Sequence, residues 1–141
     1  MIYIAGGFFN DEQLAAVKAI EDGCEEMGLD YFSPRLEGVT LKNLSPKERE
    51  DASTEVYEMN IRGICDSDCM VAIIDNYDPG TVFEIGYAVA SGIDVITISN
   101  NNYGLNVMLS KSVKYHTLSA LDAIQAYLGD DRHTITAETN T

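Results

Sequence analysis

Three carboxylates lie close together in the stretch IDNYDPGTVFEIGYAVASG, residues 74–92. Asp75 and Asp78 follow an apolar, strand-like run, and Glu84 comes next in a helix-like segment. An ionised carboxylate in a crevice can act as a nucleophile on an electron-poor carbon, and a neighbouring carboxylate can accept hydrogen bonds from a sugar hydroxyl. Glu84 is therefore a candidate nucleophile, and Asp78 is a candidate sugar ligand.

The same residues also fit an ordinary helix start. Thr81 and Glu84 have the spacing of a capping box, in which the glutamate only closes the first helical turn. Asp78 and Gly80 are common turn residues, although Gly80 would also let a ligand approach the backbone. The functional interpretation rests on position, because a helix N-terminus at the ligand-binding edge of a sheet stabilises a carboxylate as the anion.

Tyr3 lies in the first apolar segment and points to the opposite face from Ile2 and Ile4, because side chains alternate along a strand. Its phenol would reach Glu84 from a neighbouring strand, although a tyrosine in such a strand is more commonly an ordinary core residue. The following AGGFF, residues 5–9, lacks the G-x-G-x-x-G and GK[ST] phosphate patterns. It also contains no Arg or Lys, which favours an uncharged ligand.

Strand-like and helix-like segments alternate five times along the chain. The pattern predicts strands at 2–5, 29–34, 69–74, 94–99 and 114–118, and helices at 10–28, 45–64, 81–92, 105–112 and 119–129. This alternation predicts one α/β domain over residues 1–129: a doubly wound, flavodoxin-like, five-stranded parallel sheet of order 2-1-3-4-5 with helices on both faces. The ligand should bind beyond the carboxyl ends of strands one and three.

The composition narrows the possible partners and the cellular setting. The 141 residues include 23 acidic and 9 basic side chains, a net charge of −14, which argues against binding to nucleic acid or an anionic membrane. Cys24, Cys65 and Cys69 form no CxxC pair, so we expect thiols rather than a metal site. We expect a cytoplasmic protein whose polar tail, residues 130–141, is disordered or reaches a neighbouring subunit.

Three motifs, IYIAGGFF at 2–9, DPGTVFEIGYAVASG at 78–92 and YGLNVMLS at 103–110, resemble nucleoside 2-deoxyribosyltransferases in order and spacing. The resemblance implies a flavodoxin-like fold and a double displacement. A glutamate attacks the anomeric carbon of a 2′-deoxynucleoside and expels the base, and a second base then attacks the deoxyribosyl-enzyme. It implies no cofactor and no metal, and it implies a homo-oligomer with active sites at subunit interfaces.

The resemblance also assigns roles to single residues. It implies that Glu84 is the nucleophile, that Tyr3 orients it and that Asp78 binds the deoxyribose hydroxyls. It further implies that Asn106 reaches the sugar in a partner subunit's site. The residues that it places in the base pocket are Gly6, Gly7, Phe8 and Asn60. Asn60 stands where the family usually carries an Asp that helps to move a proton, and an amide has no acidic proton to give at neutral pH.

Two other functions stay open from the sequence. A 2′-deoxynucleoside 5′-monophosphate N-glycosidase on the same fold would use the same glutamate but would need phosphate ligands, for which Arg35 is a candidate. A non-enzymatic nucleotide-binding or signalling module is the second alternative. A receiver domain would use Asp75 as its phosphoacceptor, but it would need acidic residues after the first strand, where this chain has Ala5, Gly6 and Gly7.

Overall fold

The computed structural model describes residues 1–38, 41–101, 104–137 and 139–140. Its centre is a five-stranded parallel sheet of order β2-β1-β3-β4-β6. The strands are β1 (Ile2–Ala5), β2 (Tyr31–Phe32), β3 (Cys69–Ile73), β4 (Asp94–Ile98) and β6 (Tyr115–Thr117). The predicted flavodoxin-like order is confirmed, because β6 is the fifth strand of the sheet. Two shorter strands, β5 (Leu105–Asn106) and β7 (Thr139–Asn140), form a separate parallel pair.

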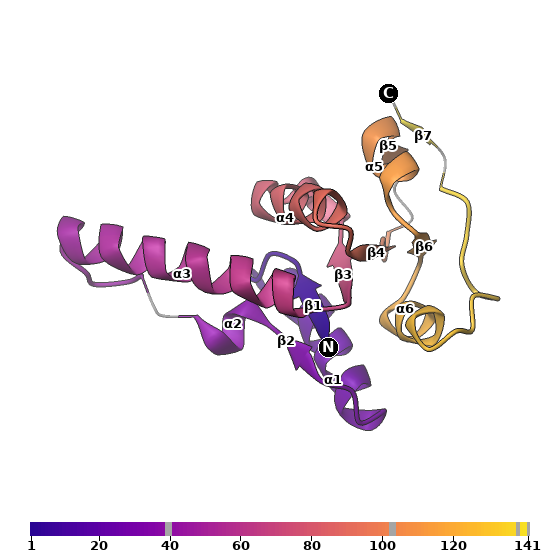
Figure 1. Ribbon diagram of the computed structural model, residues 1–141, viewed down its shortest axis with the longest axis horizontal. Helices are drawn as coiled ribbons and strands as arrows, with labels where there is room; N and C mark the ends of the chain where they lie inside the picture. The colour runs from indigo at the N-terminus through magenta and orange to yellow at the C-terminus, as the bar shows by residue number, and fades with distance from the viewer. Residues whose placement is uncertain (39–40, 102–103, 138, 141) are drawn as a thin grey trace.

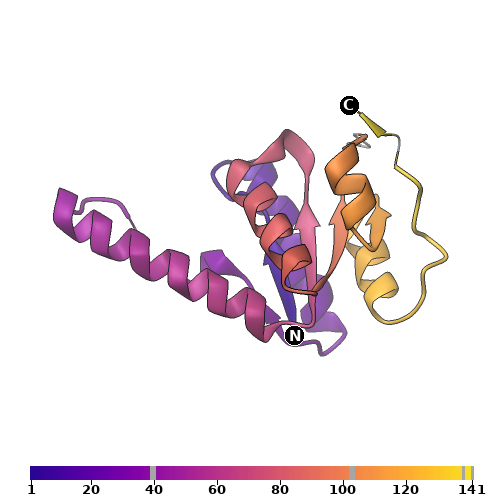
Figure 2. The same ribbon diagram turned by 45° about the horizontal axis from the view of Figure 1, so that its top comes forward.

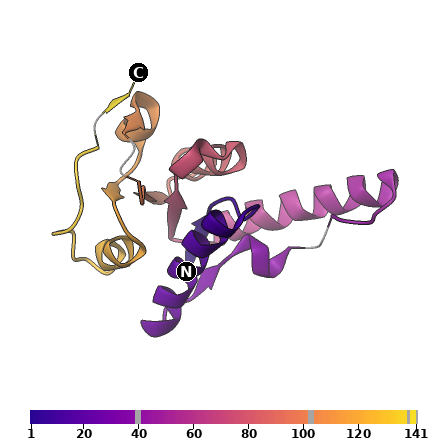
Figure 3. The ribbon, with the colours of Figure 1, turned by 180° about the vertical axis from the view of Figure 1, so that it is seen from behind.

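Helices cover both faces of the sheet (Figures 1 and 2). One face packs against α1 (Asp11–Glu26) and α6 (Ala120–Tyr127), and the other packs against α3 (Pro46–Asp66), α4 (Pro79–Ala90) and α5 (Val107–Ser112). The first half of α3 extends away from the rest of the molecule, which is clearest from behind (Figure 3). Ser45 caps this helix through a complete capping box with Glu48.

Side-chain alternation in β1 divides the core into two layers. Ile2 and Ile4 pack with α1 and α6, while Tyr3 and Ala5 pack with residues of α3 and α4. Since β1 lies between β2 and β3, Tyr3 is central in the second layer, and its side chain is fully buried. The fold therefore directs one phenol of β1 towards the helix that follows β3.

Two short elements were not anticipated. The short helix α2 (Pro34–Glu37) follows β2, and Pro34 supplies a helix-compatible φ at its first position. The described residues of the tail run beside β6, where the Ile135 amide donates to the His116 carbonyl at 2.8 Å. No helix in the described part of the chain is both long enough and apolar enough to cross a membrane.

Candidate active site

A hydrogen bond between Tyr3 and Glu84 is the centre of the candidate site. The Tyr3 hydroxyl, from β1, donates to Oε2 of Glu84 in α4. The two residues are far apart in sequence, and they meet because β1 pairs with β3 and α4 returns over that pair. The structure thus brings together the phenol and the carboxylate that the sequence singles out.

The start of α4 differs from the predicted capping box. Asp78, not Thr81, caps the helix: its Oδ2 accepts hydrogen bonds from the Thr81 amide and the Thr81 hydroxyl, both at 3.0 Å. Pro79 takes the first helical position, where its fixed φ is favourable. Glu84 therefore lies in the second turn, beyond the first turn in which the helix dipole stabilises an anion. Both the capping-box interpretation and the predicted dipole stabilisation of Glu84 are wrong.

Glu84 is half-buried and lies on the inward-facing side of α4. Thr81, Ile85 and Ala88 are buried at helical spacing, and Glu84 stands next to Ile85 on the same side of an otherwise apolar helix. A carboxylate there is removed from water without a basic partner, which is unfavourable for the folded state. An acidic residue at an inward position of an apolar helix is a feature of the sequence that indicates a functional carboxylate, and the motif comparison did not consider it.

Burial controls the ionisation of this pair. Desolvation of the Glu84 carboxyl is the largest influence on its pKa, which rises to about 7; the Tyr3 hydrogen bond lowers the pKa, and the Asp78 charge raises it. Burial, followed by the Glu84 charge and hydrogen bond, raises the pKa of Tyr3 well above its usual value. Tyr3 therefore stays a proton donor, while Glu84 divides between its acid and its carboxylate near neutral pH.

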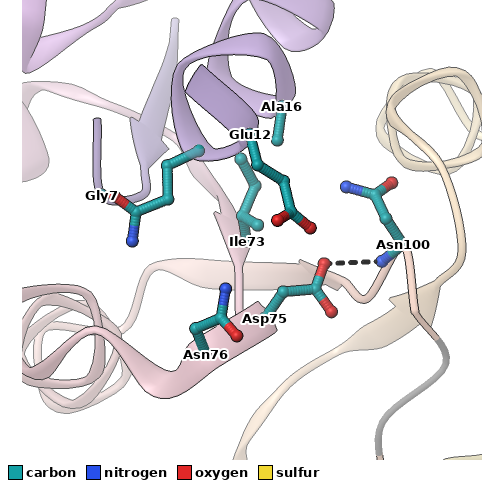
Figure 4. A pocket seen from close by; sticks show the side chains of 8 residues that line it. Gly7, Glu12, Ala16, Ile73, Asp75, Asn76 and Asn100 are labelled. Atoms are coloured by element: carbon teal, nitrogen blue, oxygen red, sulfur yellow. Dashed lines mark hydrogen bonds between the residues drawn. The ribbon is translucent and has the colours of Figure 1, made fainter. Parts of the chain in front are cut away.

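Asp75 belongs to a different network from Glu84. Its carboxylate accepts hydrogen bonds from the Ser99 hydroxyl at 3.0 Å and the Asn100 amide at 2.8 Å, which ties the end of β3 to the loop after β4. Figure 4 shows Asp75 turned towards Asn100 in a small pocket beside Gly7. Asn76 takes a left-handed conformation, φ 65°, directly after Asp75, so the chain turns sharply before Asp78.

Packing accounts for both glycines after β1. A Cβ on Gly6 would lie 3.1 Å from Val17, and one on Gly7 would lie 2.9 Å from the Gln13 amide. Both contacts are with side chains of α1, so these glycines allow the loop to lie against that helix. Phe8 and Phe9 follow and stack on each other with ring centroids 5.2 Å apart, and Phe9 is 77% exposed.

Asn60, Gly80 and Asn106 are the remaining residues that the sequence placed in the site. Asn60 is half-buried on α3, one turn before Ile64 of the Tyr3 layer, and its Oδ1 is buried without a hydrogen-bond partner among the described residues. Gly80 is exposed beside Asp78, whose Oδ2 would lie 3.3 Å from an added Cβ. Asn106 is exposed and caps α5 through the Met108 amide at 2.8 Å.

Arg35, which is partly exposed, forms an ion pair with buried Glu21 that the sequence did not indicate. Its guanidinium donates through Nε to Glu21 at 2.8 Å and through Nη2 to the other oxygen of the same carboxylate. The Ser33 hydroxyl donates to this carboxylate as well, at 2.6 Å. Glu21 is only 4% exposed and has three donors. Arg35 is thus held by Glu21 of α1 on the opposite face of the sheet from the Tyr3 layer.

Comparisons with known proteins identify the family and the fold. The family model described as nucleoside 2-deoxyribosyltransferase matches residues 2–119. A solved 2-deoxyribosyltransferase from Bacillus psychrosaccharolyticus is 30% identical, with a TM-score of 0.76 over 86% of this chain and 88% of that one. A 2-deoxyribosyltransferase from Leishmania mexicana is 24% identical, with a TM-score of 0.54 over 79% and 71% of the two chains, and it shows the fold alone.

One curated relative matches over a shorter segment. An uncharacterized protein of Acanthamoeba polyphaga mimivirus is 31% identical over 71 residues, which is 43% of this chain and 29% of that protein. This chain therefore spans less than a third of the length of that relative.

Proposed function

Because the chain belongs to the nucleoside 2-deoxyribosyltransferase family, we propose that it transfers 2-deoxyribose between nucleobases through a covalent intermediate on Glu84. The observation that carries this proposal is the Tyr3–Glu84 hydrogen bond, between a buried phenol and a half-buried carboxylate. The bond gives the carboxylate a fixed orientation and a donor that stays protonated, while burial raises the carboxyl pKa to about 7. These are properties of an activated nucleophile rather than of a helix cap.

The reaction has two displacements at one carbon. In the first, an oxygen of ionised Glu84 bonds to C1′ of a 2′-deoxynucleoside, and the C1′–N bond breaks with its electron pair going to the departing base. In the second, a nitrogen of another base bonds to C1′, and the C1′–O bond breaks to regenerate the carboxylate. Since Tyr3 holds Oε2, the attacking atom is Oε1.

The acidic surroundings of Glu84 suit the charge that develops during each step. Breaking the C1′–N bond gives the sugar oxocarbenium character, so positive charge appears at the ring only in the transition state. The Asp78 charge is close enough to raise the Glu84 pKa, and its carboxylate is assigned to the deoxyribose hydroxyls. Carboxylates close to the sugar stabilise the positively charged transition state more than the neutral substrate.

The base is assigned to the Gly6–Phe8 loop and to Asn60 of α3. Exposed Phe8 offers an aromatic surface near the carboxyl end of β1, and a flat base stacks well on such a ring. Asn60 is assigned to the edge of the base, where its amide can donate and accept hydrogen bonds but cannot protonate the leaving nitrogen. Base departure is therefore expected to be assisted less than with a carboxylic acid at this position.

Hydrolysis of a nucleoside monophosphate is disfavoured by the partners of Arg35. That reaction needs a cation for the phosphate, and Arg35 is the residue that the sequence offered. Its guanidinium is engaged by Glu21. Freeing it would leave a buried carboxylate unpaired, which is strongly destabilising.

A partner subunit is expected to complete the site. Asn106 lies exposed at the start of α5, where its side chain caps that helix, and we assign it to the sugar in a neighbouring copy. Analytical ultracentrifugation at assay concentration tests this assignment. A dimer or larger oligomer is expected, and a fully active monomer would contradict it.

An exchange assay tests the proposed function. Thymidine or deoxyinosine is mixed with free adenine, and the products are separated by chromatography. Deoxyadenosine should form with the wild-type protein and with Glu55→Gln, which changes an exposed carboxylate on α3, but not with Glu84→Gln. Release of free deoxyribose without deoxyadenosine would instead indicate a hydrolase. A parallel reaction with thymidine 5′-monophosphate in place of thymidine tests the alternative, and cleavage of the monophosphate alone would also indicate a hydrolase.

A further inference from the structure

The Tyr3 ring rests on a second aromatic ring. Phe32 of β2 is the register partner of Tyr3 in β1, and the two rings are stacked with centroids 5.4 Å apart and planes inclined by 11°. Offset stacking of this kind is a favourable aromatic geometry. The hydroxyl lies at the far end of the Tyr3 side chain, so a small change in the Tyr3 χ1 torsion, which swings the whole ring, would move the hydroxyl away from Glu84.

Gly63 of α3 encloses Phe32 from the other side. A Cβ on Gly63 would lie 2.9 Å from two ring carbons of Phe32 and 3.0 Å from a third. A glycine inside a helix is less stable than an alanine, so its presence at this position needs a packing reason. The reason here is room for the Phe32 ring, which lies between the backbone of α3 and the ring of Tyr3.

We propose that Phe32 is a positioning residue for the transfer reaction: it holds the Tyr3 ring so that the hydroxyl stays on Oε2 of Glu84, and Gly63 provides the space for it. The inference rests on the proposed function, because it presumes that the Tyr3–Glu84 pair performs the chemistry. Phe32 itself touches neither the carboxylate nor the substrate in this account. Catalysis is sensitive to small errors of placement, so loosening the ring should slow the reaction.

A double-mutant cycle between Phe32 and Tyr3 tests this inference. Phe32→Leu keeps an apolar side chain but removes the stacked ring, and it should lower kcat about tenfold with little change in KM. In the Tyr3→Phe background no hydroxyl is left to position, so the same substitution should change kcat by less than about twofold. If Phe32 only supports the fold, both backgrounds should lose activity by the same factor, and that result would overturn the inference.

Tyr31→Leu is the matched control for the loss of a ring from β2. Tyr31 is the other residue of this strand, and it packs with the α1 layer on the opposite face. This variant should keep the kcat of the wild type. A tenfold loss would show that any weakening of β2 slows the reaction, and it would overturn the specific role of Phe32.

Gly63→Ala displaces the same ring from α3 and should by itself lower kcat, so it tests the inference even if Phe32→Leu does not fold. If Phe32→Leu folds, the double variant should have the kcat of Phe32→Leu alone. An unchanged kcat in Gly63→Ala would contradict the inference. Failure of the proposed function has a different signature, namely full exchange activity in Glu84→Gln, whereas failure of this inference leaves Glu84→Gln inactive.

Discussion

Replacing Glu84 by glutamine should make the folded protein more stable at alkaline pH while abolishing exchange. Glutamine is nearly isosteric with glutamate, keeps an oxygen for the Tyr3 hydroxyl and carries no charge. The wild-type protein must hold an ionised carboxylate away from water, near the Asp78 charge, whenever the pH exceeds the Glu84 pKa. The substitution removes this unfavourable burial and with it the nucleophile.

The pKa of Glu84 sets the size of the effect. Folding raises this pKa from 4.5 to about 7, so the folded state holds the proton more tightly than the unfolded state does. The stability that the protonated form contributes is present below pH 4.5 and is lost as the pH rises to about 7. At 1.36 kcal/mol for each pKa unit, the gain from Glu84→Gln should grow from about 1 kcal/mol at pH 5 to about 3 kcal/mol at pH 8.

Urea or thermal unfolding of both proteins at pH 5 and pH 8, at one protein concentration, measures this difference. For a chain of this size, 3 kcal/mol corresponds to a rise in Tm of about 6–12 °C. Glu55→Gln, which changes an exposed carboxylate, should match the wild type at both pH values. Equal destabilisation of Glu84→Gln at both pH values would refute the reasoning, because it would mean that Glu84 stabilises the fold.

Three further predictions follow from the site. Tyr3→Phe should lower kcat by about 10–100-fold, and it should move the acid limb of the kcat/KM profile to higher pH because the Tyr3 hydrogen bond lowers the Glu84 pKa; an unmoved limb would contradict the bond. Asn60→Asp should raise turnover with at least one base by supplying a proton, and loss with every base would show that Asn60 is misplaced. Arg35→Met should destabilise the fold by about 3 kcal/mol in urea unfolding because it leaves Glu21 buried and unpaired; adding Glu21→Gln should restore most of this, and an unchanged midpoint would exclude a buried ion pair.

The strand order and the Tyr3–Glu84 contact were within reach of the sequence. Alternating strands and helices require parallel strands joined by crossovers, and the flavodoxin-like order makes the first and third strands neighbours. Alternation in β1 places Tyr3 on one face of the sheet, and the family resemblance implied that this face is the one that meets Glu84. The strand order follows from the periodicity and order of the segments, both of which can be read from the sequence.

The local geometry of the acidic turn was out of reach. Asp78 and Thr81 are both good helix caps, and the choice of Asp78 depends on Pro79 at the first position and on the bonds that Thr81 donates. The left-handed conformation of Asn76 separates Asp75 from Asp78. Neither feature has a periodic signature that the sequence would show. The three acids, close together in sequence, therefore have roles that the sequence did not separate: Asp78 caps α4, Asp75 links two loops, and Glu84 is a half-buried carboxylate.

Contacts between distant segments were also out of reach. The Glu21–Arg35 pair and the packing of Phe32 on Gly63 depend on how α1, β2 and α3 are placed around the sheet. Spacing along one element cannot report such pairs. An inward-facing glutamate on α1 and a glycine inside α3 were the only local signs, and each is informative only after the opposing element is known.

Trapping the intermediate tests the central claim most directly. A 2-fluoro-2-deoxy-arabinosyl nucleoside should react slowly with the wild-type protein, because fluorine destabilises the cationic transition state, and the sugar should accumulate on the protein. Intact-mass spectrometry with peptide mapping is expected to find one added sugar on Glu84 and none on the Glu84→Gln protein. An adduct on another residue, or a Glu84→Gln protein that still exchanges bases, would contradict the account.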